Sequence, residues 1–324
     1  MKLYHVATWG TVIWMSTACA MAAPLVPGTG YVVPGVGDNF ERVDWKYISN
    51  NPKSSQEQDE RTRLPGGRSI NGRWQESALR GHPDLIKRVP TPEGGIEGST
   101  GSLLIRSKDS GIPGRISRKS EQDDLIMMSR SSWGRSYPVS WSPSAVVRVY
   151  LPPFDQWENR SGTSFGFRTS VFGPRRYATR KGLFGRPENK AEESWPGIFF
   201  VFNSGHNRAD KKDSAYIIIR GRENGDFRGP AVTQTGWWTL GMSFTPDGMA
   251  HYYASPGVDA LSAEDRIASH YPYNFRIQRM DGVFFDIFNM YDGRTASTPW
   301  IIDDPAVYAN PPKNRMATRS RSAR

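Results

Sequence analysis

A strand-turn-strand pattern over residues 236–255 constrains the fold of this chain more than any other feature. Its first half alternates two sets of side chains between opposite faces, which is the period of a half-buried strand. The more apolar face holds Trp238, Leu240, Met242 and Phe244. Pro246, Asp247 and Gly248 then predict a tight turn, because proline presets φ and glycine accepts a positive φ. Since a lone hairpin is not stable in water, the pattern requires a larger sheet and a second layer.

The rest of the chain indicates more strands and little helix. With 37% hydrophobic residues, 32 Gly and 24 Pro in 324 residues, the composition favours a turn-rich β protein over a helical bundle. Further strands are predicted at 102–107, 124–128, 144–151, 164–172, 198–203, 214–220, 283–290 and 300–308. Residues 198–203 are apolar on both faces, which predicts a central strand. One short helix is expected over 262–267, with Ser262 as its N-cap. The pattern favours an all-β, antiparallel sandwich.

Three other segments complete the expected organisation. Residues 23–37 are rich in Gly and Pro and are expected to be a linker or an extended lead-in, so a single sandwich domain is predicted over 38–309. Residues 50–101 form a long segment rich in Gly, Pro and charge, which either supplies binding loops or wraps a sheet edge. Residues 310–324 are expected to be a disordered basic tail.

The hairpin also resembles a known superfamily. Trp237, Leu240, Asp247 and Gly248 keep the spacing of a strand-turn-strand unit, and Ile301–Tyr308 supplies a closing strand. In both features the chain resembles laminin-G-like and other concanavalin A-like jelly-roll domains, and the whole chain resembles uncharacterised secreted bacterial proteins. The resemblance implies a jelly-roll fold. That fold hosts lectins, hydrolases, lyases and adhesion modules, so it does not select an activity.

The first 22 residues read as a secretory signal peptide. Lys2 precedes an apolar stretch over 6–15, and Ala20 and Ala22 provide small residues for cleavage after Ala22. The stretch is too short for a membrane-spanning helix, whereas a lipid anchor on Cys19 stays open. The expected location is therefore periplasmic or extracellular. Cys19 is the only cysteine, so the mature chain would have no disulfide.

The charge of the chain leaves two interpretations open, an anionic partner or no partner. The formal net charge is +10, and the tail after Tyr308 is basic and has no acidic residue. Its cations are Lys313, Arg315, Arg319, Arg321 and Arg324. Such a tail is either solvated or in contact with a polyanion such as an acidic glycan. Nucleic acid is disfavoured, because no nucleic-acid-binding module is present and export is expected.

The strand faces that point away from the core suggest sugar recognition. If one face of each strand packs the two sheets together, the opposite faces present aromatic and cationic side chains on a concave sheet. The predicted carbohydrate-binding residues are Arg148, Tyr150, Tyr216, Arg220, Trp237 and Tyr253, with Thr239 and Asp286 beside them and His251 as a further candidate. Aromatic rings stack on sugar rings, and arginine binds hydroxyls or carboxylates. The alternative is that the long early segment covers this face.

Catalysis is a second hypothesis. A retaining glycosidase is disfavoured, because the acid pairs at 123–124 and 303–304 are adjacent and point to opposite faces. The chain also lacks the Glu-x-Asp-x-x-Glu strand of the glucanase-like members of the superfamily. A polysaccharide lyase would use Arg148 or Arg220 with a nearby tyrosine or with His251. We therefore expect a non-catalytic polysaccharide-binding protein first, a lyase or, less readily, a hydrolase second, and a structural or adhesion protein with a covered face third.

One metal site is considered. Zinc is disfavoured, because the histidines are scattered. Calcium would suit oxygen ligands where the first and last strands pair, and Asp38, Glu41 and Asp304 are the candidate ligands. The alternative is an N-terminal charge pair with arginine or solvent.

Overall fold

The computed structural model describes residues 25–60, 63–128, 136–177, 188–207, 209, 211–222 and 225–312. The predicted signal peptide with Cys19, and residues 313–324 of the basic tail, lie outside the described residues. Among the helices of the described ranges, none has the length and apolar character needed to cross a membrane.

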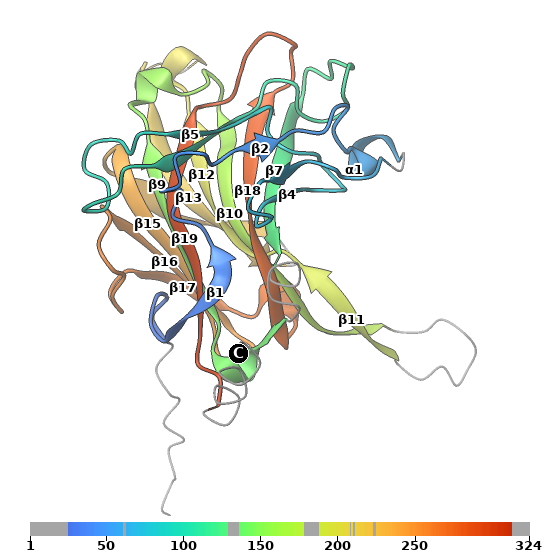
Figure 1. The fold of residues 1–324 in the computed structure, drawn as a ribbon, viewed down its shortest axis with the longest axis vertical. Helices are drawn as coiled ribbons and strands as arrows, with labels where there is room; N and C mark the ends of the chain where they lie inside the picture. The colour runs from blue at the N-terminus through green and yellow to red at the C-terminus, as the bar shows by residue number, and fades with distance from the viewer. Residues whose placement is uncertain are drawn as a thin grey trace, which may run out of the picture.

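Two antiparallel sheets pack against each other (Figure 1). Within the described residues, sheet A has eight strands in the order β17-β16-β15-β9-β19-β6-β5, with β1 also paired to β19. Its strands are β1 (Tyr31–Gly37), β5 (Leu85–Val89), β6 (Ser102–Arg106), β9 (Ser144–Leu151), β15 (Gly236–Phe244), β16 (Ala250–Pro256), β17 (Arg266–His270) and β19 (Trp300–Ala309).

Sheet B has eleven strands in the same described ranges. Their order is β14-β13-β12-β10-β18-β7-β4-β3-β2, with β11 paired to β10 and β8 paired to β18. The strands are β2 (Tyr47–Ile48), β3 (Arg68–Ser69), β4 (Gln75–Glu76), β7 (Ser120–Met128), β8 (Tyr137–Pro138), β10 (Gly162–Tyr177), β11 (Glu188–Ser194), β12 (Gly197–Asn203), β13 (Ser214–Arg222), β14 (Gly225–Val232) and β18 (Arg279–Met290).

The chain crosses repeatedly between the two sheets, as in a jelly roll. It passes from β9 in sheet A to β10 in sheet B, from β14 back to β15, and from β18 to β19. In the part of the chain that the structure describes, helical structure is limited to α1 (Gln56–Asp59) and the short 3-10 turns η1 (Val139–Trp141), η2 (Phe154–Gln156), η3 (Gly205–Asn207) and η4 (Pro272–Asn274). The predicted all-β antiparallel jelly-roll sandwich is confirmed.

The strands predicted from strong alternation form the centre of the sandwich. The hairpin over 236–255 is β15–β16, with Leu240 opposite Ala254. β12 is buried on both faces, as its sequence predicted. Between the sheets, the Trp300 ring of β19 lies 5.0 Å from the Phe165 ring and 6.0 Å from the Phe200 ring of sheet B. These aromatic contacts join the two layers.

Two local expectations are wrong. Residues 262–267 do not form a helix, because the Asp265 carboxylate accepts hydrogen bonds from the Ser262 N–H and hydroxyl at 2.7 and 2.8 Å and closes a turn before β17. The expected linker over 23–37 contains β1, which pairs with the last strand through Tyr31 opposite Ala309. Gly35 and Gly37 have positive φ, which lets this glycine-rich stretch follow the edge of sheet A.

The early segment wraps the edges of both sheets. β5 extends one edge of sheet A, and β3 and β4, together with β2 just before the segment, extend one edge of sheet B. A polar group, the Lys53 cluster (Lys53, His82, Asp84 and Asp123), holds this segment in place. Lys53, His82 and Asp123 are buried, whereas the Asp84 side chain is 32% exposed. Lys53 Nζ lies 2.6 Å from Asp123 Oδ2, 2.9 Å from Asp84 Oδ1 and 3.2 Å from the His82 carbonyl oxygen.

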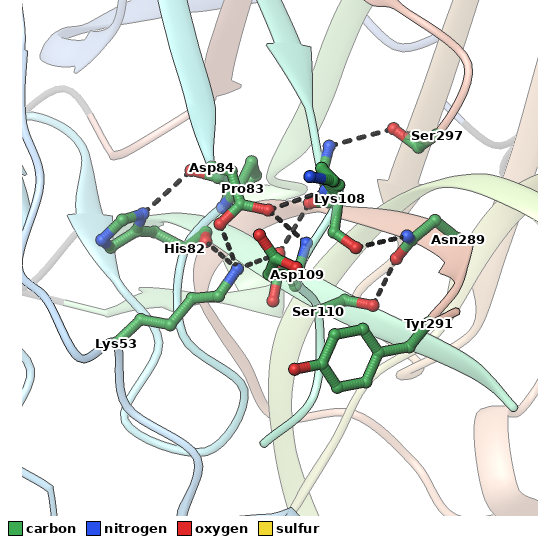
Figure 2. A network of polar contacts seen from close by, with 12 residues as sticks. Lys53, His82, Pro83, Asp84, Lys108, Asp109, Ser110, Asn289, Tyr291 and Ser297 are labelled. Atoms are coloured by element: carbon green, nitrogen blue, oxygen red, sulfur yellow. Dashed lines mark hydrogen bonds and ion pairs between the residues drawn. The ribbon is translucent and has the colours of Figure 1, made fainter. Parts of the chain in front are cut away.

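Asp84 links the Lys53 cluster to the turn that follows β6 (Figure 2). Its Oδ2 accepts the backbone N–H groups of Lys108 and Asp109 at 2.6 and 2.7 Å. Burial alone would lower the pKa of Lys53, but the carboxylates of Asp123 and Asp84 raise it above its ordinary value. Lys53 is therefore charged, and it joins the early segment to β7, although burial raises the pKa of its partner Asp123 to about 7.

Candidate functional site

The six predicted carbohydrate-binding residues do not form one site. Four lie on the outer face of sheet A: Arg148 and Tyr150 on β9, Trp237 on β15 and Tyr253 on β16. Tyr216 and Arg220 lie on β13, on the outer face of sheet B. Alternation in the sequence identified side chains that point away from the core, but it could not assign the strands to one sheet or the other.

The outer face of sheet A is covered. Trp237 and Tyr253 are only 5% and 1% exposed. The Trp237 Nε1–H donates to the Pro92 carbonyl oxygen at 3.4 Å, so part of the early segment lies over this ring. Arg148 Nε donates to the Val258 carbonyl oxygen at 3.2 Å. On sheet A, therefore, the early segment covers the aromatic face, which was the alternative to an open binding surface.

The outer face of sheet B combines arginine with aromatic rings, and we call it the arginine face. Its residues are Arg168, Phe199, Tyr216, Arg220, Arg228 and Phe284. The Arg228 guanidinium lies 4.1 Å from the centroid of the Tyr216 ring. Arg220 lies 4.6 Å from the Phe199 centroid, and Arg168 lies 5.1 Å from the Phe284 centroid. Two of these guanidinium groups are also hydrogen-bonded at their edges: Arg168 donates to the Trp195 carbonyl oxygen and to Asp286, and Arg220 donates to Asp226.

A pair of carboxyl groups lies beneath the arginine face. Asp124 on β7 is directly opposite Asp286 on β18, and both are buried. Burial, together with the repulsion of Asp286, raises the pKa of Asp124 well above its ordinary value. Burial also raises the pKa of Asp286, although Arg168 opposes the shift. Two facing carboxylates in this position cannot both be charged.

The hydrogen bonds around the two carboxyl groups indicate that Asp124 is the protonated one. Arg168 Nη1 donates to Asp286 Oδ2 at 3.2 Å, and Gln122 Nε2 donates to Asp124 Oδ1 at 2.8 Å. Asp286 Oδ1 has no hydrogen-bond partner among the described residues if both groups are ionised. A proton on Asp124 supplies the missing donor, because the two side chains are within hydrogen-bonding reach. Asp286 is thus the anion that faces Arg168.

The arginine face consequently carries more positive than negative charge. Arg220 pairs with Asp226 at 3.1 Å, and their side chains are 33% and 27% exposed. Arg168 pairs with Asp286, whereas the neighbouring Asp124 holds a proton. Arg80 also acts electrostatically on the carboxyl pair but is itself paired with Glu57, and Arg228 adds a fourth cation. A surface of this composition is complementary to anionic groups.

The three candidate calcium ligands do not form a ligand group. Asp38 Oδ2 accepts hydrogen bonds from the indoles of Trp45 and Trp74 at 2.9 and 3.0 Å and from the Asn71 amide at 2.8 Å. Glu41 accepts the Thr100 N–H at 3.0 Å. Across the described ranges there is no group of three or more histidine, cysteine or acidic side chains placed to hold a metal ion. Asp38 anchors two buried tryptophans, which is a structural role that the sequence did not reveal.

Comparison with known proteins identifies no family for this chain. No family model and no curated protein matches the chain. The chain is similar to the potassium-bound carbohydrate recognition domain of Emp46p, at 9% identity over 86% of this chain and 98% of that one, with a TM-score of 0.38. It is also similar to alginate lyase Aly36B with alginate trisaccharide, at 11% identity over 85% and 97% of the two chains and a TM-score of 0.38.

A third similar structure is an endo-β-1,4-glucuronan lyase from the fungus Trichoderma reesei. It is 11% identical over 72% of this chain and 94% of that one, with a TM-score of 0.34. Likeness at this level does not indicate what the present chain binds or catalyses.

Proposed function

We propose that this protein binds an acidic polysaccharide on the arginine face of sheet B, without cleaving it. The observation that supports the proposal is the set of arginines stacked on aromatic rings around a half-buried tyrosine. Tyr216 and Arg220, two of the residues chosen from the sequence, belong to this set. The predicted signal peptide would place the protein where extracellular polysaccharides are found.

The chemistry of the arginine face fits a uronate chain. A guanidinium can form two parallel hydrogen bonds with a carboxylate, and such bonds are stronger than those between neutral groups. Tyr216 adds an aromatic surface for the apolar side of a sugar ring. Arg220 and Arg228 are held by stacking before the ligand arrives, which lowers the entropy lost on binding.

Replacing Arg220 by alanine is expected to weaken binding of a uronate polymer by roughly tenfold or more, because a hydrogen bond to a charged group is removed. Binding by the original protein should also weaken as salt is added. Isothermal titration calorimetry with alginate and polyglucuronate would measure both effects. Arg42→Ala is the matched control, since Arg42 pairs with Asp44 at 2.6 Å and its side chain is 68% exposed. Equal affinity losses in the two variants would contradict the proposal.

A lyase is the second candidate, and one observation favours it. Arg220 and Tyr216 lie on the same face of one strand, where the first could neutralise a uronate and the second could move a proton. Elimination creates a double bond that absorbs in the ultraviolet, so incubation with uronate polymers separates binding from cleavage. Product formation that is lost in Tyr216→Phe would replace the binding proposal by the lyase.

Replacing Trp237 by alanine should leave polymer binding unchanged, contrary to the expectation from sequence. The ring is covered, so its loss should instead lower the free energy of unfolding by about 3 kcal/mol through the cavity left behind. Urea unfolding and calorimetry on the same variant would measure the two quantities. A folded Trp237→Ala protein that no longer bound polymer would restore sheet A as the binding face.

A further inference from the structure

A second concave site lies where the connection from β9 to β10 meets the connection from β12 to β13. The cavity has a volume of about 340 Å³, which is within the size range of small-molecule sites. Its wall is aromatic and comes from Phe154, Trp157 and Phe202. Its rim is polar and includes Asp155, His206 and Asp213.

The aromatic wall is a packed cluster with one accessible member. The Phe154 ring centroid lies 5.5 Å from that of Trp157 and 5.8 Å from that of Phe202. Trp157 and Phe202 are buried, whereas Phe154 is half-buried. Phe154 is therefore the ring on which the apolar face of a sugar could stack.

Hydrogen bonds hold the two connections together, so the cavity is formed before any ligand arrives. Ser204 donates its backbone N–H to Ser161 Oγ at 3.0 Å and its hydroxyl to Asn159 Oδ1. Gly205 donates its N–H to Asp213 Oδ1 at 2.7 Å. A side chain at Gly205 would collide with the backbone of Lys211, which shows how closely this turn folds back. A preformed site of this kind loses little entropy on binding.

Asp155 is the polar group best suited to hold a ligand at this cavity. It is exposed at the rim, and no hydrogen bond or ion pair within the described residues involves its carboxylate. A carboxylate with two accessible oxygens accepts hydrogen bonds from two neighbouring hydroxyl groups. Lys211 lies on the same rim, with its Nζ donating to the His206 carbonyl oxygen at 3.1 Å, so the rim also carries a cation.

We propose that this cavity binds one uncharged sugar ring, with two adjacent hydroxyls on Asp155 and the apolar face of the ring on Phe154. The site is separate from the arginine face and prefers a different ligand. It binds the hydroxyl groups of an uncharged sugar, whereas the arginine face binds carboxylates. The site lies at the N-terminal end of β13, because Asp213 of the cavity directly precedes this strand, which carries Tyr216 further along.

The test uses the full chain and the methyl glycosides of glucose, galactose and mannose, observed by saturation-transfer NMR and titration. At least one glycoside should bind, and Asp155→Asn should weaken its binding roughly tenfold or more, since the bonds lost are to a charged acceptor. Asp259→Asn is the matched control, because Asp259 is also exposed and lies outside the cavity. Phe154→Leu should reduce saturation transfer to the ring protons.

The outcome is independent of the function proposed for the arginine face. Arg220→Ala should leave glycoside binding unchanged while it weakens binding of the uronate polymer. Absence of binding by all three glycosides, or equal effects of Asp155→Asn and Asp259→Asn, would overturn the proposed sugar site and would leave the arginine face untouched.

Discussion

Replacing Asp123 by alanine is expected to lower the free energy of unfolding by about 3–5 kcal/mol, because it leaves a buried ammonium with too little compensation. Asp123 and Lys53 have side chains that are 0% and 3% exposed, and their charged atoms are 2.6 Å apart. Asp123 also accepts the Ser107 hydroxyl at 2.6 Å, so that donor loses its partner as well. Urea unfolding followed by tryptophan fluorescence would measure the loss.

The control is an ion pair with similar geometry in a different environment. Arg42 and Asp44 are also 2.6 Å apart, but their side chains are 68% and 60% exposed. Asp44→Ala should therefore leave the free energy of unfolding close to that of the original protein. The double variant Lys53→Met with Asp123→Leu should recover much of the stability, since it removes the buried charge together with its partner. Similar losses from Asp123→Ala and Asp44→Ala would show that the Lys53 cluster does not anchor the early segment.

Strands with strong alternation could be predicted from the sequence, whereas weakly patterned strands could not. Strand β9 spans the residues expected for it, and β12 is buried on both faces as expected. Strand β14 was missed, because it contains Gly229 and Pro230; as an edge strand it tolerates both. Strand β1 was missed for a similar reason, since its glycines indicate a linker when no partner strand is known.

The site could be predicted only in part, because a site depends on which strands are neighbours. Tyr216 and Arg220 were chosen correctly as outward-facing residues, yet Arg148 and Trp237 satisfy the same alternation on the other sheet. The pairing of Asp124 with Asp286 depends on the register between β7 and β18, which single-strand periodicity does not contain.

The two members of this carboxyl pair should respond differently to the same substitution. Asp286→Asn removes the anion that faces the Arg168 guanidinium, whose side chain is 9% exposed, and should cost about 3 kcal/mol of unfolding free energy. Asp124→Asn should stay within about 1 kcal/mol of the original protein, because an amide can replace the protonated carboxyl as the donor to Asp286. Equal losses in the two variants would contradict the assignment of the proton to Asp124.

The pH dependence of stability separates the variants further. Burial raises the pKa of Asp124 in the folded chain, whereas an unfolded aspartate titrates near about 3.9. The folded protein then binds more protons than the unfolded chain, so the stability contributed by this proton is complete below about pH 4 and is lost as the pH rises through the folded pKa. The asparagine of Asp124→Asn does not titrate, so this variant does not lose stability in this way as the pH rises. Its free energy of unfolding relative to that of the original protein should therefore increase between about pH 5 and about pH 8. Urea unfolding at both pH values measures the difference, and a constant difference would mean that Asp124 is ionised throughout. If the proton is present, Asp286 is the only anion of the pair opposite Arg168, and the arginine face keeps the positive charge on which binding of an acidic polymer depends.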